Sequence, residues 1–170
     1  MYKKNLSERK FSYKDQIVFS KISGDYNPLH LDKYFARKSI PGQIVVHGVN
    51  SVLWALENFT KLKKLKIKSF SVRFLNPIFL DEKIKCSWDP NKNLILIFNE
   101  KIIFSQTNIS LGEINIRPKK IKLYSSNITK PIITNINNYK SQKTRLLKFY
   151  SNPKDIKNIY PNLNNLYGQE

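Results

Sequence analysis

The longest stretch of helical periodicity in the chain begins at Gly48. Apolar side chains recur there at intervals of three and four residues, which places them on one face of a helix. Trp54 and Ala55 widen this face. The pattern predicts a helix from residue 48 to about residue 61, with a broad apolar surface suited to cover by a sheet. The face comprises Val49, Val52, Leu53, Leu56, Phe59 and Leu62.

A two-residue alternation of apolar and polar side chains follows this helix at residues 70–74 and 84–88 and predicts strands, and the continuous apolar run at residues 94–98 predicts another. The expected strands are residues 70–74, 84–88, 94–98 and 102–109, and Pro77 closes the first of them. Residues 89–91 and 99–101 are typical of turns. Consecutive strands joined by short turns indicate an antiparallel sheet. The pattern alone therefore predicts an α+β fold, with one long helix inside a curved antiparallel sheet.

The segment before residue 48 is irregular and carries helix-capping signals. Ser12 followed by Asp15 resembles a capping box, so a helix is expected to begin near Tyr13. Gly24 is a plausible end for that helix. Asp32 is a candidate N-cap for another short helix.

The length of 170 residues fits one domain with a tail. We place the domain at residues 11–124 and treat residues 125–170, which are polar and basic, as a C-terminal extension of unknown role. A single cysteine, Cys86, excludes an internal disulfide framework and a cysteine-based zinc cluster. No apolar run approaches the roughly 20 residues of a membrane span, and the N-terminus has no apolar signal core. A cytoplasmic protein is expected.

Charge is the most unusual feature of the composition. Thirty Lys and Arg against twelve Asp and Glu give a net charge of +18. Such a field favours anionic partners. The lysines are scattered, however, and the abundance of Lys, Asn and Ile also fits the composition of an AT-rich genome, so both explanations stay open. The sequence has no recognisable nucleic-acid-binding motif, so nucleic acid is not the expected partner.

Two short segments could carry chemistry. Asp25 and His30 flank a turn at Pro28, and a carboxylate and an imidazole held on one loop can share a water molecule for general acid–base work. The alternative is that Asp25 caps the turn and His30 packs beside Pro28. Gly48 opens the long helix, where its free amide could polarise a carbonyl; alternatively it only permits the turn. His47 either stabilises that turn or contacts the substrate. The pattern contains no metal-ligand spacing.

Together these segments form a much more specific signal. The stretch S-G-D-Y-N-P-L-H-L-D at residues 23–32 and V-H-G at residues 46–48 resemble the MaoC-like family and its (R)-specific enoyl-CoA hydratases. Residues 70–74, with Pro77 and Asp81-Glu82, resemble the family's strand after the central helix. The resemblance covers about residues 11–112.

The resemblance implies a hot-dog fold, a homodimer and reversible hydration of a trans-2-enoyl thioester to a 3-hydroxyacyl thioester. It implies Asp25 and His30 as catalytic residues, Asn27 as a support for them, and Gly48 as the amide that polarises the thioester carbonyl. It implies no cofactor beyond the coenzyme A or carrier-protein phosphopantetheine of the substrate. A binding or scaffold module of a biosynthetic pathway, without turnover, is the alternative. The chain continues beyond the family's usual end, so it is an extended relative or a fragment of a longer protein, and the natural substrate stays open.

Overall fold

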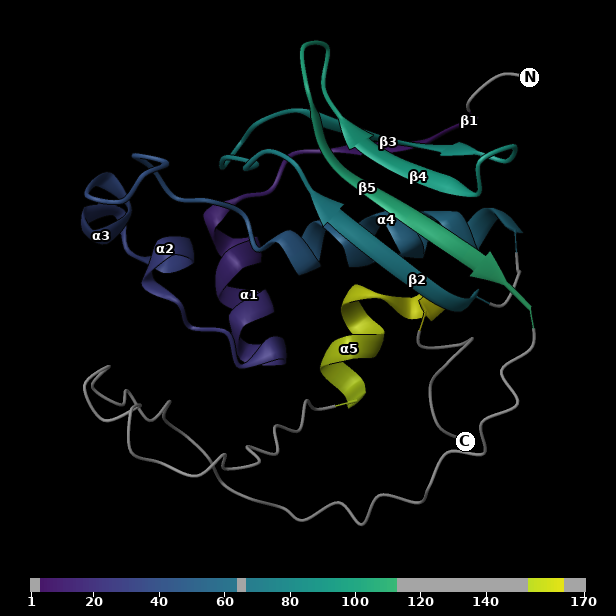
Figure 1. Cartoon of the computed structure of the whole chain (residues 1–170). Helices are drawn as coiled ribbons and strands as arrows, with labels where there is room; N and C mark the ends of the chain where they lie inside the picture. The colour runs from purple at the N-terminus through teal and green to yellow at the C-terminus, as the bar shows by residue number, and fades with distance from the viewer. Residues whose placement is uncertain (1–3, 64–66, 113–152, 164–170) are drawn as a thin grey trace, which may run out of the picture.

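The computed structural model describes residues 4–63, 67–112 and 153–163 (Figure 1). The expected domain boundary at residue 124 and most of the C-terminal extension lie outside the described residues. No helix in the described ranges has both the length and the apolarity needed to cross a bilayer.

The core of the molecule is a five-stranded antiparallel sheet with the order β1-β3-β4-β5-β2. The four strands expected from the sequence are present, each within a few residues of its expected bounds. The sequence prediction omitted the edge strand β1, which is polar and pairs with β3. The strands are β1 (Lys4–Arg9), β2 (Ile67–Phe74), β3 (Ile84–Asp89), β4 (Leu94–Phe98) and β5 (Ile103–Leu111).

The helix α4 (Gly48–Lys63) lies along the concave face of this sheet (Figure 1). Its apolar residues meet those of β3 and β4, and the rings of Phe59 and Trp88 lie 4.7 Å apart. Ile84, Ile95 and Ile97 are fully buried beneath it. Burial of side chains of this size stabilises the fold by roughly 1.5–3 kcal/mol each. The expected α+β architecture, one long helix covered by a curved antiparallel sheet, is confirmed.

Three helices gather at the N-terminal end of α4 (Figure 1). α1 (Tyr13–Ser23) begins with the expected capping box of Ser12 and Asp15, and Gly24 ends it at a φ of 72°. This φ is in the left-handed region, where glycine lacks the steric penalty of other residues. α2 (Pro28–Leu31) and α3 (Lys33–Arg37) follow, and Asp32 caps α3 as expected.

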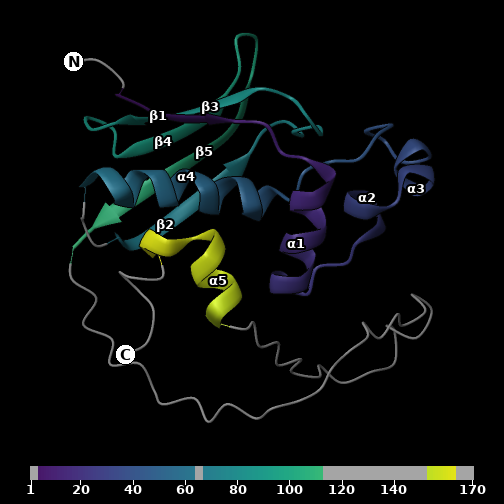
Figure 2. The ribbon, with the colours of Figure 1, turned by 180° about the vertical axis from the view of Figure 1, so that it is seen from behind.

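α5 (Pro153–Ile159) covers the side of α4 that faces away from the sheet (Figures 1 and 2). Tyr160 is buried, and its hydroxyl donates a hydrogen bond of 2.6 Å to Oδ1 of Asn50. The carboxylate of Glu57 accepts hydrogen bonds of 2.8 Å from the amides of Asn162 and Leu163. The described part of the extension is therefore packed against the central helix.

Candidate functional site

The loop between α1 and α2 has a conformation fixed by its own side chains. Oδ1 of Asp25 accepts a hydrogen bond of 3.1 Å from the amide of Asn27, and Oδ1 of Asn27 accepts one of 3.0 Å from the amide of Leu29. The second bond caps α2, where Pro28 occupies the first turn and lacks an amide hydrogen. Asn27 thus stabilises the loop in two ways: its amide donates to Asp25, and its side chain caps α2 at the amide of Leu29.

The loop and the start of α4 bring three titratable side chains together. Asp25, His30 and His47 each offer one ligating atom within 4.8 Å of the others. The two imidazole rings stack with centroids 3.9 Å apart, and Oδ2 of Asp25 lies 3.9 Å from Nε2 of His47. Among the described residues this is the group spaced to hold a metal ion, although its ring nitrogens are largely engaged in hydrogen bonds. Asp25 and His30, proposed from the sequence as a pair, do lie side by side.

His30 is oriented by a single hydrogen bond. Its Nδ1 lies 2.7 Å from the carbonyl oxygen of Val45. A carbonyl can only accept, so Nδ1 carries the hydrogen, and Nε2 of the neutral ring keeps a free lone pair. The ring is partly exposed, so solvent can approach it. His30 therefore presents a base to the space beside α4.

His47 is buried and binds three elements together. Its Nδ1 lies 2.7 Å from Oε1 of Gln16, its Nε2 lies 3.1 Å from the carbonyl oxygen of Asp25, and Oγ of Ser20 lies 3.5 Å from Nε2. Burial, and secondly the neighbouring His30, lower the pKa of His47, while Asp25 partly opposes them. Oε1 of Gln16 and the carbonyl oxygen of Asp25 can only accept, so the neutral ring, with one N–H, donates to one of them at a time. The contact of His47 with substrate stays a prediction.

Gln16 is the site residue that the sequence did not reveal. It is fully buried in α1, and its Oε1 accepts hydrogen bonds from both the backbone amide and Nδ1 of His47. Its Nε2 is buried and has no hydrogen-bond partner among the residues that the structure describes. The available signal was spacing, because Gln16 and Ser20 lie one turn apart and share the inner face of α1.

Gly48 is the first residue of α4, so its amide has no acceptor within the helix. A Cβ at this position would lie 2.8 Å from Cε1 of Phe74, which is shorter than real contacts allow. The ring of Phe74 on β2 can approach the helix start only because residue 48 has no side chain. The glycine therefore serves close packing, and its amide lies beside the same space.

That space is a cavity of about 440 Å³ beside the start of α4. His30 and Gly48 both line it, and apolar side chains from β2 and the start of β5 form much of the rest. Its size falls within the range of small-molecule sites. The cavity thus places a base and a helix-terminal amide beside one largely apolar chamber, whose walls include Val45, Val49, Phe74, Leu75, Ile78 and Phe104.

Comparisons with known proteins agree on one family. The family model described as MaoC like domain matches residues 3–102. A peroxisomal protein of Arabidopsis thaliana named enoyl-CoA hydratase 2 is 28% identical over 107 residues, which cover 60% of this chain and 34% of that protein. This chain therefore matches about a third of the length of that relative.

Solved structures show the same fold at low sequence identity. An (R)-hydratase from A. caviae involved in PHA biosynthesis has a TM-score of 0.53 and 21% identity, and the match covers 64% of this chain and 91% of that one. An R-hydratase from Pseudomonas aeruginosa has a TM-score of 0.52 and 19% identity over 71% of this chain and 90% of that one. A MaoC-like dehydratase from Rhodospirillum rubrum has a TM-score of 0.54 and 11% identity over 65% and 88% of the two chains. The fold is a hot-dog fold, and the chain belongs to the MaoC-like domain family.

Proposed function

We propose that this protein reversibly adds water to a trans-2-enoyl thioester to give a 3-hydroxyacyl thioester. The observation that carries the proposal is the proximity of Asp25 to His30, which lines a cavity that Gly48 also lines. Membership of the MaoC-like domain family supports it. So does the similarity to a relative that is itself named an enoyl-CoA hydratase.

In the proposed reaction a water molecule lies between the side chains of Asp25 and His30. Nε2 of His30 and Oδ2 of Asp25 both accept hydrogens, so together they orient the water and remove one of its protons. The hydroxide oxygen bonds to C3 of the enoyl group, and the electrons of the double bond move toward the thioester carbonyl. The dyad then returns a proton to C2.

In the proposed reaction Gly48 stabilises the negative charge on the thioester oxygen. The negative charge that develops on the thioester oxygen needs a hydrogen-bond donor fixed in advance. The amide of Gly48 is such a donor, at the positive end of the dipole of α4. The apolar walls of the cavity are suited to the acyl chain, since they strengthen these interactions by excluding water.

The test is the absorbance of the enoyl-thioester band with trans-2-butenoyl-CoA as substrate. Asp25→Asn and His30→Gln are each expected to lower kcat/KM by about 10²- to 10⁴-fold, because each removes one acid–base group. Asn at position 25 keeps an oxygen for the amide of Asn27, so the loop should stay folded. Asp81→Asn is the matched control, because Asp81 is exposed and its φ of 60° suits asparagine. Full activity in both dyad variants would refute the mechanism.

The same proposal includes a homodimer formed along β2. This strand is an edge of the sheet, and Phe70 and Phe74 on it are about half exposed. An exposed apolar edge strand is a template for pairing with a second copy. Phe74 also lines the cavity beside His30, so a second copy on this edge would help to close that cavity. Sedimentation of the active preparation as a monomer would contradict this part.

A further inference from the structure

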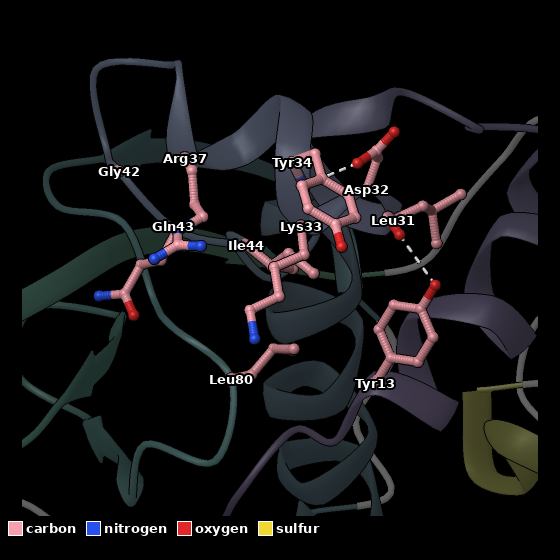
Figure 3. Close-up of a pocket in the computed structure, with 10 residues that line it drawn as sticks. All are labelled: Tyr13, Leu31, Asp32, Lys33, Tyr34, Arg37, Gly42, Gln43, Ile44 and Leu80. Carbon is pink, nitrogen blue, oxygen red and sulfur yellow. Dashed lines mark hydrogen bonds between the residues drawn. The ribbon is translucent and has the colours of Figure 1, made fainter.

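A second, larger cavity of about 750 Å³ lies beside α3, and Leu31 at the end of α2 also lines it (Figure 3). α1, α3 and residues 42–44 frame it, and Leu80 forms its floor. The proposed reaction gives this cavity no role, because none of its lining residues belongs to the dyad or to the wall of the smaller cavity.

The larger cavity contains two cations without an acidic partner. Lys33 and Arg37 lie one turn apart on α3, and Figure 3 shows both charged groups reaching into the hollow. The one carboxylate in the lining, Asp32, is engaged by the cap of α3: its Oδ1 accepts 2.8 and 3.1 Å hydrogen bonds from the amides of Tyr34 and Phe35. No ion pair recorded among the described residues involves Lys33 or Arg37. The chemistry of the cavity favours a ligand with more than one negative charge.

Aromatic rings stand beside these cations. Tyr34 is 78% exposed, and Tyr13 is fixed by a 2.8 Å hydrogen bond from its hydroxyl to the carbonyl oxygen of Leu31. Figure 3 shows both rings at the rim of the hollow. An exposed aromatic ring next to a guanidinium group suits a planar base attached to phosphates, since the ring can stack and the guanidinium can bind phosphate oxygens.

The two cavities share one thin wall. His30 lines the smaller cavity and the next residue, Leu31, lines the larger one. Likewise, Val45 lines the smaller cavity and Ile44 lines the larger one. The carbonyl oxygen of Val45 accepts the hydrogen bond that orients His30. A ligand anchored in the larger cavity is therefore near the dyad.

We propose that the larger cavity binds the nucleotide end of coenzyme A, with the phosphates on Lys33 and Arg37 and the adenine against Tyr34. This rests on the proposed function, which supplies the thioester at the other end of the pantetheine arm. The occupant is a nucleotide rather than the acidic surface of a carrier protein for two reasons. The site is a hollow of small-molecule size, and it offers an aromatic ring as well as charge.

Calorimetric titration with adenosine 3′,5′-bisphosphate tests the cavity without any turnover. The double variant Lys33→Ala/Arg37→Ala is expected to weaken binding by about tenfold or more, since it removes charge-assisted hydrogen bonds. The control Lys92→Ala/Lys101→Ala removes the same charge from exposed turns outside the cavity and should change affinity by less than about twofold at physiological ionic strength. Equal affinity of the wild-type protein and the Lys33/Arg37 variant would overturn the proposal.

Kinetics on two thioesters then separate this proposal from the proposed function. With trans-2-butenoyl-CoA the Lys33/Arg37 variant should show a raised KM and an unchanged kcat. With the butenoyl thioester of pantetheine, which has no nucleotide, it should match the wild type. If the protein binds the nucleotide through Lys33 and Arg37 but turns over neither thioester, the nucleotide-binding proposal stands and the proposed hydratase function is refuted. A raised KM confined to carrier-protein substrates would overturn the nucleotide assignment.

Discussion

The two cavities beside α2 differ in how their polar groups are held. In the smaller one His30 is oriented by a hydrogen bond of 2.7 Å, and the ring of His47, on which it stacks, is buried and held by another of 2.7 Å. In the larger one Lys33 and Arg37 are exposed and form no ion pair with any residue in the described ranges. Proton transfer requires atoms fixed within tenths of an ångström, whereas attraction of a phosphate requires charge that can adapt. The contrast fits chemistry in the first cavity and anchoring in the second.

After the dyad variants, the largest effect on the smaller cavity is expected from Gly48→Ala. The new Cβ would lie 2.8 Å from the ring of Phe74, so either the ring or the start of α4 must move. We expect kcat/KM for trans-2-butenoyl-CoA to fall about 10²-fold, because the amide is displaced from the thioester oxygen. Unfolding in denaturant should show a loss of about 1–3 kcal/mol from overpacking. Affinity for adenosine 3′,5′-bisphosphate in the larger cavity should not change.

Phe74→Leu in the Gly48→Ala background separates packing from chemistry. The smaller side chain makes room for the Cβ, so most of the lost stability should return. Activity should stay low if the thioester carbonyl must approach the amide of residue 48 more closely than a Cβ on that residue allows. Recovery of both would show that Gly48 serves packing alone.

The sequence predicted the helices and strands that are determined by the pattern of their own side chains. Alternation located β2 and β3, and apolar runs between turns located β4 and β5. The apolar face of residues 48–62 located α4, because burial of such side chains drives all these elements. β1 has a polar sequence and exists through its pairing with β3, from Lys4 opposite Trp88 to Arg9 opposite Ile84. The contact of Tyr160 with Asn50 joins residues 110 positions apart. Neither long-range interaction leaves a periodic signal.

The site divides along the same line. Asp25 and His30 stand in one short motif and Gly48 in a second, both visible in the sequence. The structure places Asp25 beside His30, and His30 and Gly48 line the same cavity. The close stacking of His30 on His47 and the support from Gln16 depend on how α1 packs against the start of α4. In the sequence Lys33 and Arg37 are two of many scattered basic residues, and only the fold shows that both line one cavity.

A moderate effect is expected from pH, and it should involve His47. The pKa of His47 in the folded protein lies below its ordinary value of 6.5, chiefly because of burial. As the pH falls below about 6.5, the unfolded chain takes up a proton at this position while the folded protein resists. The free energy of unfolding should therefore decrease with falling pH until the folded pKa is passed.

Denaturant unfolding of the wild type and His47→Gln across this pH range checks the effect. His30 and Asp25, the titratable side chains that contact His47, are retained in the variant, so their contributions stay in both curves. The variant should be less stable at neutral pH and less dependent on pH. Parallel curves would assign the pH dependence to groups other than His47.

The smallest effect is expected from Tyr160→Phe, which removes one hydroxyl from the contact between α5 and α4. The 2.6 Å hydrogen bond to Asn50 is lost, and Oδ1 of this buried side chain loses its donor. The cost should be about 1–2 kcal/mol, visible as a lower midpoint of thermal unfolding. Asn50 lies two residues beyond Gly48 in α4, so we expect kcat/KM in the smaller cavity to fall by about twofold at most.

Tyr34→Phe is the control, since its exposed hydroxyl should not contribute to the unfolding midpoint. Reduced nucleotide affinity in Tyr160→Phe would contradict the independence of the two cavities, because α5 contributes no residue to the lining of the larger one.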